Sequence, residues 1–306
     1  MRCSGNERRI RVTNHESRVT MKSWLLAARP KTLSAAVVPV MLGLALAPRP
    51  IHVGLAACTL FGALFIQIAT NFINDALDFK KGADTTERLG PLRVTQGGLI
   101  SAEAVMRAAY VCFGLAALCG IPLIVRGGWP LLAIGVASIL CSYIYTGGPY
   151  PLAYNGLGEL FVMVFFGFVA VAGTYYVQAL TLDRAVLVAG YIAGSLATVL
   201  LVINNLRDVE SDRASNKKTM VVRLGEDFGR IEIAFFAFTP FIAQIFVADL
   251  RNRSWLLLPL AAAFIALALI TRMKASHGRE LNRCLAQAGA LQWAFGILFV
   301  IGSLFG

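Results

Sequence analysis

The stretch "ATNFINDALDFKKGADTTERLGPLRVTQGG" occupies residues 69–98 and joins an uncharged apolar segment to a dense group of charges. Asp75, Asp78 and Asp84 follow one another within ten residues, with lysines and arginines close behind them. Carboxylates at the end of an apolar helix are costly and usually mark a functional site. The stretch therefore predicts a membrane helix that ends in a polar binding site.

The composition supports a membrane protein. Of the 306 residues, 57% are hydrophobic and 15% are charged, whereas about a quarter of the residues of a soluble domain are charged. The net charge of +11 does not indicate a nucleic-acid partner, because the basic residues lie in short gaps between apolar segments. The six cysteines are scattered without a CxxC pair and the three histidines are isolated, so a disulfide framework or a histidine metal site is not expected.

We predict an all-α integral membrane protein with nine transmembrane helices around a central cavity. Residues 1–22 are polar and lack the apolar core of a signal peptide, so they are expected to form a disordered tail. Residues 23–306 are expected to form one transmembrane domain. A membrane helix needs about 20 mainly apolar residues, and the predicted segments are 31–48, 52–74, 104–125, 129–147, 157–180, 184–206, 229–249, 254–272 and 282–305.

The distribution of basic residues predicts the orientation, because lysine and arginine collect on the cytoplasmic side of membrane proteins. With nine spans and a cytoplasmic N-terminus, most of the 28 lysines and arginines fall on the cytoplasmic side. The exceptions are Arg49, Arg126, Arg184, Arg251 and Arg253. A helix miscounted in the middle of the chain would remove this asymmetry.

A second polar stretch, "NNLRDVESDRASNKK", ends another apolar segment. Asn204, Asp208 and Asp212 are spaced four residues apart, so they would form one stripe on a helix. Asn74 and Asp78 have the same spacing 130 residues earlier. Four predicted spans separate the two stretches, which places both on the cytoplasmic face. We expect the two carboxylate stripes to face each other across one cavity.

All-oxygen clusters of this kind favour a hard cation. Mg²⁺ typically binds one or two carboxylates together with waters and substrate phosphates, so the clusters predict Mg²⁺ that in turn holds a phosphorylated ligand. Glu210 is instead expected to be a solvated charge beside its basic neighbours. Basic residues near the clusters would neutralise a diphosphate; they are Arg29, Lys31, Lys80, Lys81, Arg88, Arg93, Arg207, Lys217 and Lys218.

The two polar stretches resemble the aspartate-rich motifs of the UbiA-type intramembrane aromatic prenyltransferases. The resemblance covers residues 22–305, and the predicted spans and orientation also match that superfamily. The details are most similar to its 1,4-dihydroxy-2-naphthoate prenyltransferase branch. The segments that carry this likeness are "DFKKGAD", "GPLRVTQGGLIS", "YTGGPYPLAYNGLGE" and "NNLRDVESD".

The resemblance implies a role for each matching position. In the family these residues bind Mg²⁺ bridged to a prenyl diphosphate, which implies the metal ligands Asn74, Asp78, Asp84, Asp208 and Asp212. The four aspartates of that set and Arg207 would be catalytic. Substrate-binding or supporting roles fall to Asn74, Asp75, Asn204, Asn205, Arg29, Lys31, Arg88 and Arg93. Tyr145 and Tyr150 are candidates to face a carbocation, although interfacial anchoring is an equally good interpretation of both.

The family's chemistry implies that the allylic C–O bond ionises and that an electron-rich ring attacks the resulting carbocation. In the naphthoate branch, attack at the carbon bearing the carboxylate releases CO₂ and yields demethylmenaquinone, or its phytyl equivalent. The expected partners are a polyprenyl diphosphate, 1,4-dihydroxy-2-naphthoate and the lipid bilayer. The expected location is the inner (plasma) membrane, crossed several times, with the active site on the cytoplasmic face.

Three other interpretations are open from the sequence. A cation-coupled transporter would suit intramembrane acids and an internal repeat, but it predicts acids near the middle of the bilayer. A phosphatidyl-type alcohol transferase also uses aspartates and Mg²⁺, yet its DGxxAR segment is absent. Another branch of the prenyltransferase superfamily, making ubiquinone, plastoquinone, haem or chlorophyll precursors, remains the main alternative.

Overall fold

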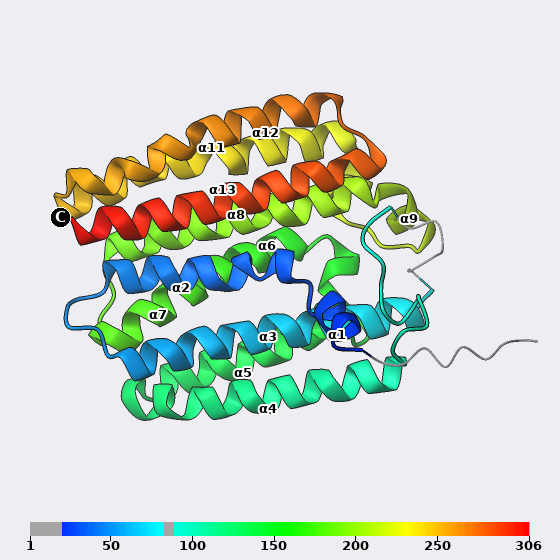
Figure 1. The fold of residues 1–306 in the computed structure, drawn as a ribbon, viewed down its shortest axis with the longest axis horizontal. Coiled ribbons are helices and arrows are strands. Elements are labelled where there is room, and N and C mark those ends of the chain that lie inside the picture. The colour runs from blue at the N-terminus through cyan, green and yellow to red at the C-terminus, as the bar shows by residue number, and fades with distance from the viewer. Residues whose placement is uncertain (1–19, 83–88, 306) are drawn as a thin grey trace, which may run out of the picture.

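The structure is a computed structural model that describes residues 20–82 and 89–305, and within these ranges every regular element is a helix (Figure 1). Most of the predicted polar tail lies outside the described residues. The α-helices are α1 (Met21–Ala28), α2 (Ser34–Leu46), α3 (Val53–Lys80), α4 (Ala102–Gly127), α5 (Trp129–Ile144), α6 (Gly158–Val162), α7 (Ala170–Ala179), α8 (Arg184–Arg207), α9 (Val209–Ala214), α10 (Met220–Leu224), α11 (Glu226–Arg251), α12 (Ala263–Ala275) and α13 (Leu281–Leu304). The other elements are the 3₁₀ helices η1 (Pro30–Thr32), η2 (Leu152–Asn155), η4 (Ser254–Ala262) and η5 (Gly278–Glu280), and the π-helix η3 (Met163–Val169).

Long apolar helices make the chain a multi-pass membrane protein. Seven helical stretches in the described residues are long and apolar enough to cross a bilayer. The pair Met21–Thr32 and Ser34–Leu46 also passes when taken together, with a bend of 51°, and α5 is a shorter apolar helix. Each of the nine predicted segments falls on one of these helical stretches. The count of nine spans and the cytoplasmic N-terminus remain predictions.

Helix α8 forms the centre of the bundle. It packs against α2, α11, α13 and η3, and Figure 1 shows it running between the upper and lower helices. About 78% of its most apolar window is buried, which is typical of a helix that is hydrophobic all round. The second polar stretch begins at its end, so a largely buried helix carries half of the predicted site.

Small residues allow η3 to approach α8 closely. A Cβ atom added at Gly194 would lie 2.5 Å from the sulfur of Met163 and 2.9 Å from the Met163 carbonyl oxygen. A Cβ atom at Gly167 would lie 2.5 Å from the carbonyl oxygen of Gly190. Glycines four residues apart on α8 thus admit the facing backbone, as small residues do at many membrane helix interfaces.

Gly194→Ala is expected to destabilise the protein, because the added methyl group must displace the Met163 backbone. Overpacking of this kind costs about 1–3 kcal/mol of unfolding free energy, and it would lower the Tm of the detergent-purified protein. Gly114→Ala on α4 is the control, since no atom lies within 4 Å of its added Cβ. An unchanged Tm for Gly194→Ala would contradict the close packing of η3 on α8.

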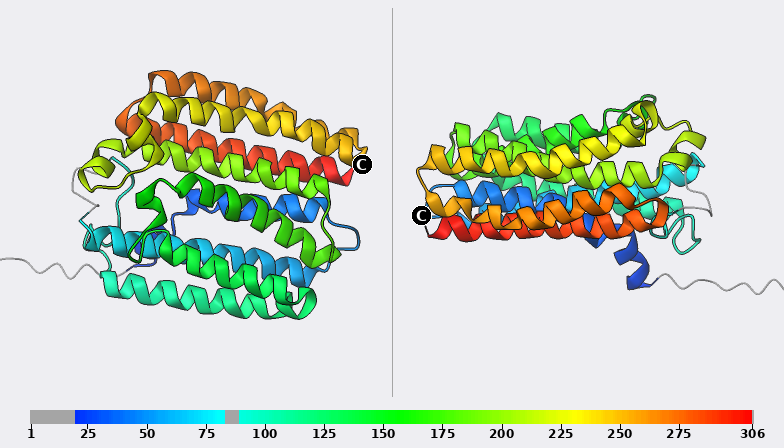
Figure 2. Two further views of the ribbon diagram at one scale, coloured as in Figure 1. Left: turned by 180° about the vertical axis from the view of Figure 1, so that it is seen from behind. Right: turned by 90° about the horizontal axis from the view of Figure 1, so that it is seen from above.

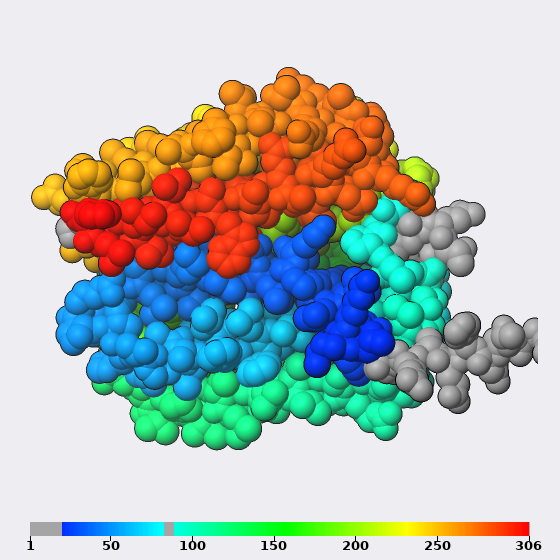
Figure 3. All heavy atoms as spheres, in the orientation of Figure 1, coloured from blue at the N-terminus to red at the C-terminus, as the bar shows by residue number. Residues whose placement is uncertain are grey.

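Both predicted polar stretches lie at one end of the bundle. Figure 1 places α9, α1 and the chain that follows α3 at the same end, opposite the C-terminus. Helix α1 stands out from the bundle in the right-hand view of Figure 2 and lies against α3 on the surface in Figure 3. Its Trp24 ring contacts Phe72 with centroids 5.7 Å apart, while Met21 and Leu25 are exposed. This short helix therefore presents apolar side chains at the surface of the bundle.

Candidate active site

Asp75 and Asp78 lie one turn apart near the end of α3 and have different partners. The carboxylate of Asp75 accepts hydrogen bonds from the backbone N–H groups of Val94, at 3.2 Å, and Thr95, at 3.1 Å. Its exposed fraction is 1%. Asp75 therefore holds the loop at residues 89–101 against the helix. This contact positions Arg93, a basic residue of the same loop.

Asp78 is held by two donors from distant parts of the chain. Its Oδ2 accepts a hydrogen bond from Arg93 Nη2 at 3.0 Å, and its Oδ1 accepts one from the hydroxyl of Tyr154 at 2.9 Å. Asp78 and Arg93 are buried, and Tyr154 is partly buried. Charge-assisted bonds of this kind fix the orientation of a carboxylate.

Tyr154 connects the two polar stretches. The Nζ atom of Lys81 lies 4.4 Å from the centroid of its ring, and the Nζ atom of Lys217 lies 5.9 Å from the same centroid. Its carbonyl oxygen accepts a hydrogen bond from the backbone N–H of Lys218 at 3.0 Å. Sequence reasoning missed Tyr154, because nothing in "YPLAYN" distinguishes it from the neighbouring tyrosines.

Arg207 and Asp208 form a bidentate ion pair at the end of α8. Arg207 donates from Nε at 2.8 Å and from Nη2 at 2.6 Å to the two carboxylate oxygens. Its Nη1 donates to Asn282 Oδ1 at 3.0 Å, and Asn282 in turn donates to the carbonyl oxygen of Leu89 at 3.0 Å. The guanidinium is buried. Arg207 thus orients Asp208 within a network that joins three segments.

Asp212 has a buried oxygen that the described residues leave unsatisfied. Lys217 Nζ lies 3.2 Å from its Oδ1, while Oδ2 has no hydrogen-bond partner among the described residues. Burial, only partly opposed by the Lys217 ammonium, raises the pKa of Asp212 to about 6, and the charges of Asp208 and Asp78 add to this shift. Three carboxylates are therefore close enough to repel one another, which favours a bound cation.

Two asparagines of the polar stretches line a cavity, and a third packs between helices. Asn74 and Asn204 both line the cavity, and Asn74 Oδ1 accepts a hydrogen bond from the hydroxyl of Thr146. Asn205 instead donates to the buried carboxylate of Glu159 at 3.0 Å. Asn74 and Asn204, the first residue of each i, i+4 stripe, thus reach the cavity. Asn205 supports the packing of α8 against α6.

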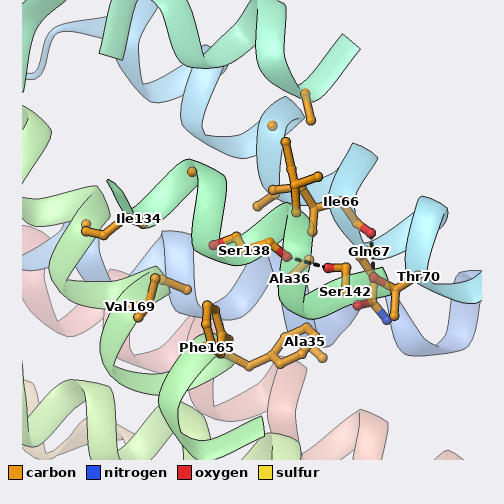
Figure 4. A pocket seen from close by; sticks show the side chains of 18 of the residues that line it. Ala35, Ala36, Ile66, Gln67, Thr70, Ile134, Ser138, Ser142, Phe165 and Val169 are labelled. Carbon is orange, nitrogen blue, oxygen red and sulfur yellow. Dashed lines mark hydrogen bonds between the residues drawn. The ribbon is translucent and has the colours of Figure 1, made fainter. Parts of the chain in front are cut away.

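A cavity of about 410 Å³ lies within the bundle, and Asn74 and Asn204 are among the residues that line it. Its walls are mostly apolar and come from α2, α3, α4, α5, α7, α8 and η3 (Figure 4). Arg29 and Tyr145 line it, and the Tyr145 ring lies 5.9 Å from that of Phe161. A pocket of this size with a few convergent polar groups is typical of a small-molecule site.

Two predicted site residues lie away from the cavity, and two others are outside the described residues. Lys31 is exposed and does not line the cavity, and Tyr150 is 61% exposed at the surface. Asp84 and Arg88 lie outside the described residues, so the structure does not place them. The described residues that the structure brings together around the two stretches are Asn74, Asp78, Lys81, Arg93, Tyr154, Asp208, Asp212 and Lys217.

The donors present fit a hard divalent cation. Within the described ranges, no group of three or more His, Cys, Asp or Glu side chains is arranged to hold a metal by itself. Mg²⁺ does not need such a group, because it takes one or two carboxylates and completes its shell with water and phosphate oxygens. The unsatisfied Oδ2 of Asp212 and the repelling carboxylates around it are compatible with that arrangement.

The family model of the UbiA prenyltransferase family matches residues 36–303. The chain therefore belongs to this family of membrane prenyltransferases. Among its curated relatives is the 1,4-dihydroxy-2-naphthoate octaprenyltransferase of Haemophilus influenzae, which is 34% identical over 94% of this chain and 97% of the relative. The enzyme of the same name from Escherichia coli is 41% identical over 67% of this chain and 69% of its own. The 2-carboxy-1,4-naphthoquinone phytyltransferase of Synechocystis is 27% identical over 92% of this chain and 93% of the relative.

Solved structures share the fold. A UbiA homologue from Archaeoglobus fulgidus bound to DMAPP and Mg²⁺ matches with a TM-score of 0.66, covering 91% of this chain and 99% of that one, at 15% identity. The apo structure of a UbiA homologue from Aeropyrum pernix matches with a TM-score of 0.67 over 89% of this chain and 97% of that one, at 14% identity. At these identities the likeness establishes the fold.

Proposed function

We propose that this chain transfers a prenyl group from an allylic polyprenyl diphosphate to 1,4-dihydroxy-2-naphthoate with loss of CO₂. The product is the reduced form of demethylmenaquinone, or its phytyl equivalent. The observation that carries the proposal is that Asn74 and Asn204, one from each carboxylate motif, line the same apolar cavity. The names of relatives that match nearly the whole chain support the choice of acceptor.

The diphosphate group is proposed to bind between the two motifs with Mg²⁺. Asn74, Asp78, Asp208 and Asp212, together with Asp84, would hold the ion. When bound by these residues, Mg²⁺ would supply positive charge that stabilises the diphosphate as a leaving group. Basic side chains at the same end, Lys81, Lys217 and Arg29, add to that charge.

The reaction balances without an added oxidant or reductant. The allylic C–O bond breaks and the diphosphate leaves with the electron pair. The ring carbon that bears the carboxylate then bonds to the prenyl carbon that carried the diphosphate. The bond to the carboxylate breaks, its electrons restore the aromatic ring, and CO₂ departs. The apolar walls of the cavity would exclude water from the carbocation, and Tyr145, which lines the cavity, is proposed to face it.

The cellular setting follows from the substrates. A prenyl chain gains roughly 0.8 kcal/mol for each buried CH₂ group, which accounts for a site within the bilayer. We place the enzyme in the inner (plasma) membrane with its motifs on the cytoplasmic face. A transporter is less suitable, because Asp78 and Asp208 lie at helix ends rather than in the middle of a span.

The acceptor assignment is tested with detergent-purified protein, farnesyl diphosphate and a panel of aromatic acceptors. We expect Mg²⁺-dependent transfer to 1,4-dihydroxy-2-naphthoate with one CO₂ released per product, and no transfer after chelation with EDTA. 4-Hydroxybenzoate is the control acceptor and should stay unmodified. Transfer to 4-hydroxybenzoate but not to dihydroxynaphthoate would assign the chain to another branch of the family.

A further inference from the structure

Gln67 lies in the wall of the cavity, and the reaction described above gives it no role. Its exposed fraction is 8%, and its Oε1 is buried without a hydrogen-bond partner among residues 20–82 and 89–305. Burying an amide group without a partner is costly. An unsatisfied amide that lines an apolar cavity therefore indicates a polar group on a ligand.

Two hydroxyl groups line the cavity near Gln67. Thr70 on α3 donates its hydroxyl hydrogen to the carbonyl oxygen of Ile66, and Ser142 on α5 donates to that of Ser138, both at 2.8 Å. Because each hydroxyl has only one hydrogen, their oxygens are left as acceptors. Figure 4 shows Gln67, Thr70 and Ser142 at the same end of the drawn part of the cavity, where α3 packs against α5.

The depth of this group follows from the hydrogen bond between Asn74 and Thr146. Helices α3 and α5 run in the same direction (Figure 1). Thr70 and Ser142 each precede a member of that pair by four residues, so they lie level with each other, about 6 Å deeper along the helices. Gln67 lies about 10 Å deeper than Asn74 on the same face of α3.

We propose that Gln67, with Thr70 and Ser142, binds a phenolic hydroxyl of the aromatic acceptor. This inference rests on the proposed function. The prenyl chain has no polar atoms, and the diphosphate belongs with the motifs at the end of the cavity. The two hydroxyl oxygens and Oε1 attract a hydrogen-bond donor, while the Nε2 of Gln67 can donate to the oxygen of the same phenolic hydroxyl. The acceptor ring then lies between Gln67 and the motifs, with one hydroxyl pointing inward and its carboxylate toward the reacting end.

Gln67→Met tests the assignment, because methionine keeps the length of the side chain and removes both polar atoms. The KM for 1,4-dihydroxy-2-naphthoate is expected to rise about tenfold, as for the loss of one hydrogen bond to a buried partner. The KM for farnesyl diphosphate should stay within about twofold of wild type. Ser142→Ala is a second variant, with an expected rise in acceptor KM of about threefold.

An acceptor analogue makes the test specific. 1-Hydroxy-2-naphthoate keeps the carboxylate and the adjacent hydroxyl but lacks the second hydroxyl, and its inhibition constant is measured on each variant. We expect Gln67→Met to leave this constant unchanged, because the group that Gln67 binds is missing. Thr59→Val is the matched control. Thr59 is on the same helix and lines the same cavity, but it precedes Gln67 by eight residues and so lies about 12 Å further along the helix.

The outcomes separate this inference from the proposed function. An unchanged KM for dihydroxynaphthoate in Gln67→Met, with a normally active wild type, would overturn the assignment of Gln67 alone. An equal loss of affinity for the acceptor and for its monohydroxy analogue would also overturn it, since that pattern indicates a structural role. A wild-type protein that does not use dihydroxynaphthoate would overturn the proposed function itself.

Discussion

Asp78→Asn and Asp208→Asn are each expected to lower the rate of prenyl transfer by about a thousandfold or more. Loss of a single well-oriented electrostatic contact to a developing charge costs two to three orders of magnitude in other enzymes. Here each aspartate would act through Mg²⁺ on the same leaving group. Asparagine has nearly the same shape as aspartate, so the variant should still insert. The measurement is turnover of farnesyl diphosphate and dihydroxynaphthoate in membranes containing equal amounts of protein.

Glu210→Gln is the control for these two variants. Glu210 lies in the same motif as Asp208 but is exposed and pairs with Arg213 at 2.9 Å. Its substitution should leave turnover near the wild-type rate, because exposed pairs contribute little. Near-normal turnover in both Asp78→Asn and Asp208→Asn would contradict the metal site.

Tyr154→Phe is expected to lower turnover by about 10- to 100-fold. The substitution removes the hydroxyl that donates to Asp78 at 2.9 Å and keeps the ring beneath Lys81. A hydrogen bond to a charged group contributes about 1.5–3 kcal/mol, and its loss would leave Asp78 held by Arg93 alone and less firmly oriented toward the metal. The rate should fall further in Tyr154→Leu, which also removes the ring.

Tyr150→Phe is the matched control for Tyr154. Tyr150 stands four residues earlier in the same loop and is 61% exposed. Its hydroxyl can be removed without effect on the motifs, so turnover should stay unchanged. Equal rates for Tyr150→Phe and Tyr154→Phe would show that the bond to Asp78 has no part in catalysis.

Much of the fold was predictable from the sequence, because a membrane helix requires a continuous segment of apolar residues that local hydropathy reveals. All nine predicted segments fall on helical stretches, and the boundaries differ by a few residues. The irregular parts were not predicted. The π-helix η3 and the 3₁₀ helix η4 interrupt long apolar segments, and these breaks depend on packing against other helices rather than on a local signal.

The candidate site was predictable where it depends on helical spacing. The i, i+4 pattern predicted that the two carboxylate stripes face one cavity. Asn74 and Asn204 line the cavity, whereas Asp78, Asp208 and Asp212 do not. The partners of the charged side chains were not predictable, since they come from distant segments. Arg207 bonds to Asn282, 75 residues away, and Asp78 bonds to Tyr154, 76 residues away. The role of Arg207 toward the diphosphate stays a prediction, and its ion pair with Asp208 is a contact that the sequence did not predict.

The central claim is that the two motifs together bind a divalent cation and a prenyl diphosphate. Calorimetric titration of the purified protein with farnesyl thiodiphosphate, an analogue that ionises very slowly, tests it most directly. We predict binding that requires Mg²⁺ and that is lost in Asp78→Asn and in Asp208→Asn but retained in Glu210→Gln. Binding of equal strength without Mg²⁺, or in both aspartate variants, would contradict the claim.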